Sequence, residues 1–381
     1  MLSKVNHQSN FCNEKIPGLP VYSSLSSTCY SVQHFFTFQR RRGKSPKHSF
    51  GSQYTQIIKT LKECSIFDNN SYKVNGYLNS GFDGVIFDVS KDEKNYIAKV
   101  IIDDGAKYTS CNRELILYTL KSKNVMYVNQ IITYDFFKSY IGRFYFYSCA
   151  LILERADVDL SKKDLFTKKD KDAKIENSRK LFRFFGKVIQ GFAEINFKGK
   201  VLHGDIKPAN IMIKYTESKD SFDKDFEPVI IDFSLSLATT NPIDNFPRYD
   251  QGYRPPEMEE GDIKSYKYSK DFNEDFYALG KTIEQVLQYH EEFINRNQCE
   301  IYELKTLASN MTNKRDPNQA TQPSLTNSFN SYYRPNMKQV LSSAISIMKE
   351  CNIDNDKSVN EEFYKQASNS LKDLAKELLI I

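Results

Sequence analysis

One stretch decides the fold of this chain: His203-Gly204-Asp205-Ile206-Lys207-Pro208-Ala209-Asn210, which runs into the apolar segment Ile211-Met212-Ile213. A hydroxyl that attacks a phosphate needs a carboxylate to orient it and to accept its proton, and Asp205 has that capacity. Asn210 lies five positions later and offers one of the hard oxygen ligands that hold Mg²⁺ against phosphates. Lys207 adds a positive charge between them. This spacing is typical of a phosphoryl-transfer loop.

The same residues also fit an ordinary turn before a buried strand, because Gly and Asp are common turn residues. Other parts of the chain decide between a phosphoryl-transfer loop and an ordinary turn. Lys99 lies within the apolar run Ile97–Ile101, where a lysine needs an anionic partner or an exit to solvent. Glu114 is the expected partner, since the segment Cys111–Lys121 has helical spacing and can carry it over a sheet.

A further carboxylate follows a second buried run. Asp232 comes directly after Val229-Ile230-Ile231 and is expected as the second magnesium ligand, opposite Asn210. An N-cap or turn aspartate is the competing interpretation, but it leaves the pairing with Asn210 unexplained.

The composition predicts a globular protein with a sizeable core, since 40% of its 381 residues are hydrophobic. The net charge of +5 comes from 53 basic and 48 acidic residues that are mostly interspersed, so no nucleic-acid partner is expected. No apolar run reaches the roughly 18 residues that indicate a membrane span. The seven cysteines are odd in number and scattered, which favours a reducing compartment without structural zinc. We therefore expect an intracellular protein, cytoplasmic or nuclear.

Residues 1–65 have the composition of a polar, basic tail. The first 62 residues are rich in Ser, Asn and Gln, with Glu14 as their one acidic residue, which predicts disorder. An organellar transit segment is the alternative, although arginine is absent from the first 39 residues. The cluster Arg40-Arg41-Arg42-Gly43-Lys44 is expected to be a solvated charge run, with a nuclear or anionic-partner signal as the alternative.

Short β-rich runs separated by turns predict an antiparallel meander in the next part of the chain. The expected strands cover 72–78, 85–90, 96–102, 131–137 and 144–154, with a turn at 138–142. Gly81 and Gly84 lie in the first turn, where backbone N–H groups can approach phosphates, although a plain hairpin has the same spacing. A charged connector follows at 157–177, and apolar residues from Leu181 then keep a helical period up to Gly199.

Taken in this order, the residues resemble the eukaryotic-type protein kinase superfamily, over roughly Tyr72–Met348. The resemblance implies an α+β, two-lobed protein kinase fold, with a small antiparallel β-rich N-lobe that carries one key helix and a larger, mainly helical C-lobe. The implied kinase domain covers 66–350, with the N-lobe at about 66–154 and the C-lobe at about 157–350. Residues 351–381 are expected to add an amphipathic helical extension.

The resemblance also implies roles for individual residues. Catalysis is expected from Asp205, Lys207, Lys99 and Glu114. The residues expected to bind ATP are Asn79, Ser80, Gly81, Phe82, Gly84, Ile86, Lys99, Glu154 and Ala156. Asn210 and Asp232 are the expected Mg²⁺ ligands, and structural roles are expected for His203, Phe233, Glu257, Asp275 and Arg334.

The function implied is ATP- and Mg²⁺-dependent transfer of the γ-phosphate to Ser or Thr of protein substrates, because Lys207 follows the serine/threonine pattern. Two alternatives stay open. His-Gly-Asp also occurs in small-molecule kinases of the aminoglycoside and choline type, against which Lys207-Pro208 and Pro256-Glu257 speak. A pseudokinase scaffold with weak or no catalysis is the other. The sequence does not indicate the oligomeric state, the substrate or the pathway.

Several departures from the family pattern bear on activity and control. Asn79 replaces the first glycine of the phosphate-covering loop, and Ser234 replaces the glycine after Phe233. Ile97 stands where alanine is usual, so either the adenine site narrows or the strand slips by one residue. Gly204 replaces the arginine that pairs with a phosphorylated activation loop, and we therefore expect activity without that phosphorylation. Insertions are expected to lengthen the loops at 215–227 and 316–334.

Overall fold

A computed structural model describes residues 64–67, 72–80, 84–103, 109–141, 144–162, 165–166, 169–215, 226–238, 251–256 and 272–313. All of them belong to the unit Ile57–Ile381. The expectations for the N-terminal tail, for the loop at 316–334 and for the extension at 351–381 lie outside the described residues. The same holds for most of the loop at 215–227.

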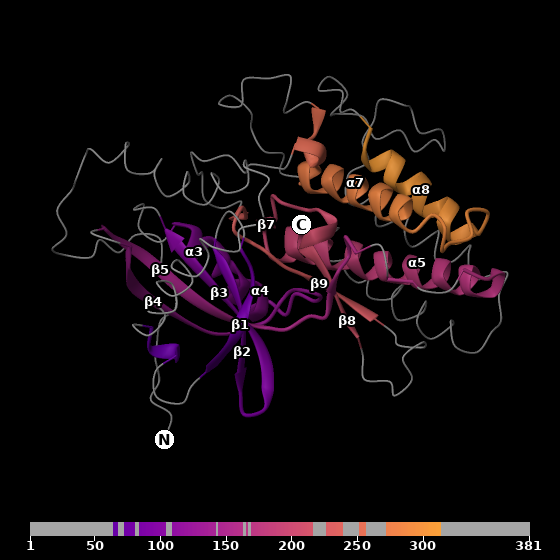
Figure 1. Cartoon of the computed structure of the whole chain (residues 1–381). Helices are drawn as coiled ribbons and strands as arrows, with labels where there is room; N and C mark the ends of the chain where they lie inside the picture. Colours follow the sequence, from indigo (N-terminus) through magenta and orange to yellow (C-terminus); the bar gives the residue numbers. More distant parts are fainter. Residues whose placement is uncertain are drawn as a thin grey trace, which may run out of the picture. The chain divides into compact units, whose positions relative to one another are not determined.

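The N-terminal part of this unit is a five-stranded sheet, as the sequence predicts (Figure 1). Its strands are β1 (Lys73–Ser80), β2 (Val85–Lys91), β3 (Lys94–Asp103), β4 (Ile131–Ile141) and β5 (Phe144–Glu154), in the order β1-β2-β3-β5-β4. Every neighbouring pair is antiparallel. Val85, Phe87 and Val89 are buried at alternate positions of β2, which is the period of a strand that packs one face on a core.

The hairpin between β4 and β5 differs from the prediction. The expected turn at 138–142 is wrong, because β4 continues to Ile141 and pairs in register with β5 up to Ile141↔Phe144. Tyr and Phe residues fill this part of both strands, and aromatic residues favour the extended conformation over a turn. The sheet is therefore longer on this side than the sequence suggested.

The expected helix over 111–121 is two short helices, α3 (Thr109–Glu114) and α4 (Ile116–Ser122). The break falls at Leu115, whose carbonyl accepts a hydrogen bond from the N–H of Tyr118, three positions on, over 3.0 Å. That spacing belongs to a tighter turn than the α-helix and interrupts its pattern. α3 is joined to β5 by a disulfide between Cys111 and Cys149, which the count and spacing of the cysteines did not indicate.

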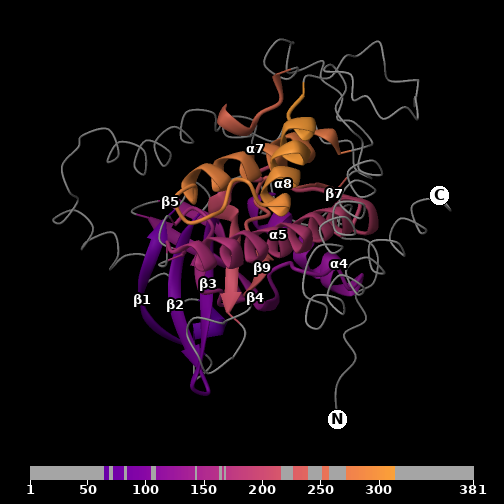
Figure 2. The same cartoon turned by 90° about the vertical axis from the view of Figure 1, so that its right-hand side faces the viewer.

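The C-terminal part of the unit is mainly helical. Helix α5 (Lys171–Ala193) begins where the Asp170 carboxylate accepts a hydrogen bond from the N–H of Ala173 over 2.9 Å. It continues as the π-helical segment η3 (Glu194–Lys198), which ends before Gly199 as expected. Two further helices are α7 (Asn273–Tyr289) and α8 (Cys299–Met311), and Figure 2 shows them packed together over α5. Among the helices of the described ranges, none is both long and apolar enough to cross a membrane.

Small strands and turns make up the remaining described elements. They form a three-stranded sheet, a two-stranded sheet and three short 3₁₀ turns. The three-stranded sheet has the order β6 (Val158–Asp159), β8 (Ile211–Tyr215), β9 (Phe226–Ile230), and the pair is β7 (Val201–Leu202) with β10 (Leu237–Ala238). The turns are η2 (Ser65–Phe67), η4 (Pro208–Asn210) and η5 (Gln251–Tyr253). Both small sheets flank the loop at 203–210, which holds that loop between two ladders of hydrogen bonds.

Candidate active site

Helix α7 anchors the loop at 203–210 through the side chain of Asp275. The buried Asp275 carboxylate accepts hydrogen bonds from the backbone N–H of His203 over 2.8 Å and of Gly204 over 3.0 Å. Gly204 has a φ of 81°, a left-handed conformation that glycine adopts without strain. Ser236 closes the loop from the other side by donating its hydroxyl to the carbonyl of His203 over 2.9 Å.

The polar side chains of the loop converge on Asp205. The Asn210 amide donates to the side-chain Oδ2 and to the backbone carbonyl of Asp205, both over 2.8 Å. Lys207 Nζ lies 3.0 Å from the same Oδ2. Asp205 is only 7% exposed, so these partners hold its carboxylate in one orientation.

His203 supports the loop as a neutral ring. Its Nδ1 accepts the N–H of Asp205 over 3.3 Å, so the proton lies on Nε2, which donates to the carbonyl of Ile231 over 3.1 Å. The ring packs against Phe233, with 4.7 Å between centroids. Burial lowers the pKa of His203, and this outweighs the nearby carboxylates of Asp275 and Asp232.

Lys99, Glu114 and Asp232 meet in a buried cluster formed by β3, α3 and the segment after β9. Lys99 Nζ donates to Glu114 Oε1 and, over 2.7 Å, to Asp232 Oδ1. Lys99 and Glu114 are buried, whereas the Asp232 side chain is partly exposed. Asp232 has a left-handed φ of 67°, which is uncommon for a residue with a side chain, although aspartate tolerates it better than most.

The three charges shift one another's pKa values. Burial acts to lower the pKa of Lys99, but the two carboxylates outweigh burial and the pKa lies above its ordinary value. Burial raises the pKa of Glu114 to about 7, against the opposing effect of Lys99. For Asp232, burial acts to raise the pKa, and Lys99 reverses this, so the pKa lies well below its ordinary value. Asp232 therefore stays ionised across the physiological range.

The comparisons with known proteins agree with this geometry, since the protein kinase domain family matches residues 72–380. This chain belongs to the protein kinase family. The resemblance inferred from the motifs and the predicted two-lobed α+β fold are thus confirmed. The family is one of phosphotransferases that act on proteins.

Among solved structures, this kinase is similar to the ROP18 kinase domain, which was solved in complex with AMP-PNP and sucrose. The TM-score is 0.51 at 14% sequence identity, and the match covers 94% of this chain and 98% of that chain. At this identity the likeness concerns the fold alone. No curated protein matches the kinase in sequence.

The oxygen donors of the kinase fit a magnesium ion that also binds phosphates. Ile211 pairs with Ile230 across β8 and β9, and the N–H of Ile231 donates to the carbonyl of Asn210 over 3.0 Å. This register brings Asn210 and Asp232 to the same end of the small sheet. Within the described ranges, three or more His, Cys, Asp or Glu side chains nowhere gather closely enough to hold a metal by themselves. One carboxylate and one amide suit Mg²⁺, which takes its remaining ligands from water and phosphate.

The described residues among those expected around ATP lie on or next to β1, β2, β3 and β5. Asn79 and Ser80 end β1, and the Ser80 N–H donates to Asn79 Oδ1 over 2.9 Å. Ile86 of β2 pairs with Lys99 of β3. Glu154 ends β5 and accepts from Lys214 over 3.1 Å, with the half-buried Ala156 two positions on. Gly81, Phe82, Glu257 and Arg334 lie outside the described residues.

The structure answers one question that the sequence left open, whether β3 slips by one residue at Ile97. The β3 register with both neighbours is continuous from Tyr96 to Lys99 and beyond, so the strand does not slip and Ile97 shares a face with Lys99. At Gly84, a Cβ would lie 2.3 Å from the carbonyl oxygen of Val100. Glycine is therefore needed at 84 for packing on β3, whatever it does for phosphates.

Sequence reasoning missed further residues that hold the site in place. Asn196 of η3 donates its amide to Asp275 Oδ2 and to the carbonyl of Val201, both over 2.8 Å. Arg113 of α3 donates to the carbonyl of Ser234 over 3.5 Å. A single Asn in an apolar helical run carries a weak signal, because polar residues on such a run are usually solvated. Its place directly after Ile195, within that apolar run, was the available clue in the sequence.

Proposed function

We propose that this kinase transfers the γ-phosphate of ATP, in the presence of Mg²⁺, to serine or threonine hydroxyls of protein substrates. The observation that carries the proposal is the assembly of Lys99 with Glu114 and Asp232 in the same fold that holds Asp205 with Asn210 and Lys207. Each of these groups has a task in phosphoryl transfer, and a scaffold would not need all of them.

Asp205 orients the attacking hydroxyl and accepts its proton as the bond from oxygen to phosphorus forms. Lys207, beside it, stabilises negative charge on the transferred phosphoryl group, and the bond from the γ-phosphorus to the bridging oxygen breaks to release ADP. Lys99, oriented by Glu114, binds the phosphates that stay on the nucleotide. Asn210 and Asp232 would hold Mg²⁺, which neutralises charge on the phosphates when bound.

Specificity for serine and threonine rests on Lys207, which is the residue that serine/threonine kinases place two positions after the base. Independence from activation-loop phosphorylation rests on Gly204, which offers no cation to a phosphate. Ile97 shares a face with Lys99 and replaces the usual alanine, so we expect a narrower adenine site.

The test is transfer of labelled γ-phosphate to a library of Ser, Thr and Tyr peptides by wild type and by an Asp205→Asn variant. We expect label on Ser and Thr peptides, loss on chelation of Mg²⁺, and a rate lower by about 10²–10⁴ in the variant. Nucleotide affinity should stay within about twofold, since Asp205 faces the acceptor hydroxyl. Asp172→Asn, on an exposed turn of α5, is the matched control and should behave as wild type.

Other outcomes would contradict the proposal in different ways. Label on aminoglycosides or choline, with none on peptides, would identify a small-molecule kinase. Absence of Mg²⁺-dependent nucleotide binding and of transfer would identify a pseudokinase. One observation favours a pseudokinase: Lys99 donates a hydrogen bond to Asp232, and a nucleotide with Mg²⁺ would have to break this hydrogen bond in order to bind both residues.

A further inference from the structure

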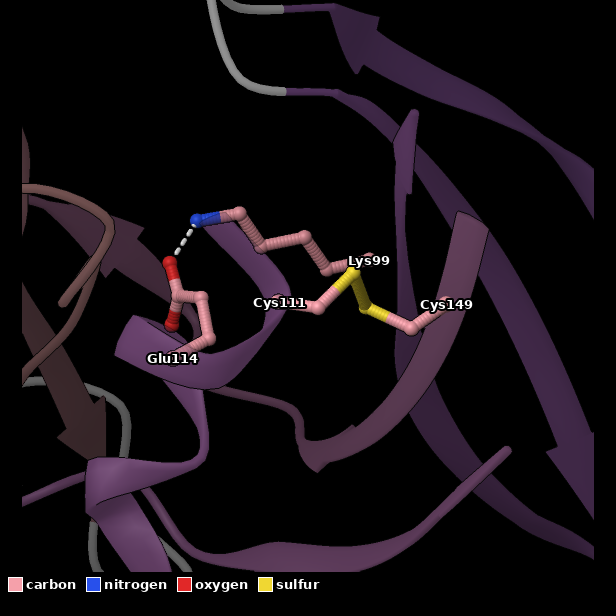
Figure 3. The surroundings of a disulfide bond; sticks show 4 residues. All are labelled: Lys99, Cys111, Glu114 and Cys149. Atoms are coloured by element: carbon pink, nitrogen blue, oxygen red, sulfur yellow. Dashed lines mark hydrogen bonds and ion pairs between the residues drawn. A yellow bond between two sulfur atoms is a disulfide. The ribbon is translucent and has the colours of Figure 1, made fainter. Parts of the chain in front are cut away.

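The disulfide between Cys111 and Cys149 lies beside the pair formed by Lys99 and Glu114, as Figure 3 shows. Cys111 and Glu114 are both on the six-residue helix α3, three positions apart. Residues at that spacing lie on the same face of a helix. Helix α3 thus directs a sulfur and a carboxylate toward the sheet from one face.

The sheet meets these two groups with one face as well. Ile101 is opposite Cys149, and Lys99 is opposite Leu151, in the pairing of β3 with β5. Residues two apart on a strand share a face, so Lys99 and Cys149 lie on the same side of the sheet. The disulfide and the ion pair are therefore two parallel connections between the same helix and the same sheet face (Figure 3).

Helix α3 depends on these connections. A helix of six residues is far below the length of about 12–15 residues at which helices become stable on their own. Of its described side chains, Cys111 and Glu114 are buried, Asn112 is exposed and Arg113 is half-buried. The Cα atoms of Cys111 and Cys149 are 6.1 Å apart, which suits a disulfide. Leu115 connects α3 to α4, which buries Leu117 and Leu120. The disulfide adds a direct covalent attachment of α3 itself to the sheet.

We propose that the Cys111–Cys149 disulfide is a redox switch that controls the position of Glu114 and, through it, the affinity of the kinase for nucleotide. In the oxidised protein the link keeps α3 on the sheet and Glu114 bonded to Lys99. In the reduced protein α3 keeps the ion pair, the contact from Arg113 to Ser234 and its continuation into α4, but it loses the covalent attachment to the sheet, and Glu114 leaves Lys99 more often. The consequence for ATP rests on the proposed function, whereas the movement of α3 does not.

The chemistry of the switch is thiol–disulfide exchange with a dithiol reductant. A thiolate of the dithiol attacks one sulfur, the Cys111–Cys149 bond breaks, and a mixed disulfide forms. The second thiol of the reductant then closes its own disulfide and releases the remaining cysteine. Two electrons and two protons pass to the protein, which ends with two thiols, and the reductant ends as a cyclic disulfide.

Because the disulfide is buried, its reduction by a dithiol is coupled to the ion pair between Lys99 and Glu114. Both sulfurs are 0% exposed, so a dithiol reaches them only when α3 separates from β5. Glu114 lies three positions along the same short helix, and such an opening also removes it from Lys99. A nucleotide that binds Lys99 in its paired form opposes the opening. Linkage then requires that nucleotide protect the disulfide by the same factor by which reduction weakens nucleotide binding.

The first measurement compares the affinity of a non-hydrolysable ATP analogue for the oxidised and the dithiol-reduced kinase. We expect the Kd to rise at least about fivefold on reduction, the lower end of common coupling between sites. A saturating concentration of the analogue should raise, by the same factor, the ratio of reduced to oxidised dithiol needed for half-reduction. Cys111→Ser should bind as the reduced protein does in both conditions. Cys299→Ser, which removes an exposed cysteine at the start of α8, should behave as wild type.

The second measurement needs neither activity nor a variant. Amide hydrogen exchange over 109–122 should be faster in the reduced wild-type protein than in the oxidised one, with α8 unchanged as the internal reference. Equal exchange and equal Kd in the two states would overturn the inference, as would alkylation of both cysteines in folded protein kept without reductant. If the protein proved to lack phosphotransfer while exchange over 109–122 still followed the redox state, the proposed function would fail and the switch would stand.

Discussion

The carboxylate of Asp275 accepts a hydrogen bond from the backbone N–H of His203 over 2.8 Å, across 72 positions of the chain. Its second oxygen accepts the N–H of Gly204, and Asn196 donates to the first. One buried side chain of α7 therefore determines where the loop begins, and the loop in turn presents Asp205. The position of the proposed base depends on a residue that does not touch the phosphates.

Asp275→Asn should destabilise the protein. The amide keeps one acceptor oxygen but presents an NH₂ group to a backbone N–H, which leaves a buried donor without an acceptor. We expect the free energy of unfolding to fall by about 2–4 kcal/mol, measured by urea denaturation. The matched control is Asp172→Asn on an exposed turn, with a change within about 0.5 kcal/mol. Equal effects of the two substitutions would contradict the role given to Asp275.

His203 should make the protein sensitive to mild acid. Its pKa is lowered in the folded state, so the ring stays neutral there while the unfolded chain binds a proton below about pH 6.5. The contribution of the neutral His203 ring to the free energy of unfolding is fully present above the pKa that His203 has in the unfolded chain. It is lost as the pH falls below that pKa. Glu114, whose pKa is raised to about 7, has the opposite effect in the same range but is the same in both proteins. We therefore expect the free energy of unfolding of the wild type, relative to that of His203→Gln, to decrease between about pH 7 and pH 5.5. Identical slopes for wild type and variant would show that His203 does not cause the dependence.

Gly280 should not tolerate a methyl group. A Cβ there would lie 2.8 Å from Met311 Cβ and 3.0 Å from the carbonyl oxygen of Ala308, where α7 packs on α8. The overlap should outweigh the better helix propensity of alanine, so we expect Gly280→Ala to cost about 1–2 kcal/mol in thermal or urea unfolding. Gly76→Ala is the matched control, because a Cβ at Gly76 meets nothing within 4 Å. That control should lose no stability.

Activity should survive removal of the threonines in the segment after Asp232. Gly204 offers no cation to a phosphate there, so Thr239→Ala/Thr240→Ala should retain at least about half of the wild-type kcat/KM on the best peptide substrate. Phosphatase treatment of the wild-type kinase should have an equally small effect. A loss of tenfold or more in either experiment would show that control by phosphorylation exists despite the missing arginine.

The fold was predictable because several short polar motifs occur in the order in which the protein kinase family has them. Lys99 stands in an apolar run, Asp232 follows another, and Asp205 and Asn210 are five apart, so each needs a partner that the others supply. The structure brings Lys99 together with Glu114 and Asp232, and Asp205 together with Asn210. The domain boundaries near 65, 154 and 350 stay predictions.

Other features depend on tertiary contacts that the sequence does not display. Cys111 and Cys149 are 38 positions apart, and seven scattered cysteines allow many pairings, so the disulfide had no local signal. The break at Leu115 is a matter of one hydrogen bond, which propensity does not resolve. Asn196 is an ordinary polar residue until Asp275 is placed beside it. For the disulfide and for Asn196, the role of the residue depends on a partner that is distant in the sequence.

The backbone conformation at Gly204 also affects which substitutions the loop tolerates. Its φ of 81° lies in a region that costs residues with a side chain about 1–2 kcal/mol. An arginine introduced there would carry this cost. A substitution to arginine would therefore lower the stability of the loop by about this amount while it added the missing cation. A cation introduced at a position with an ordinary backbone conformation would carry no such cost.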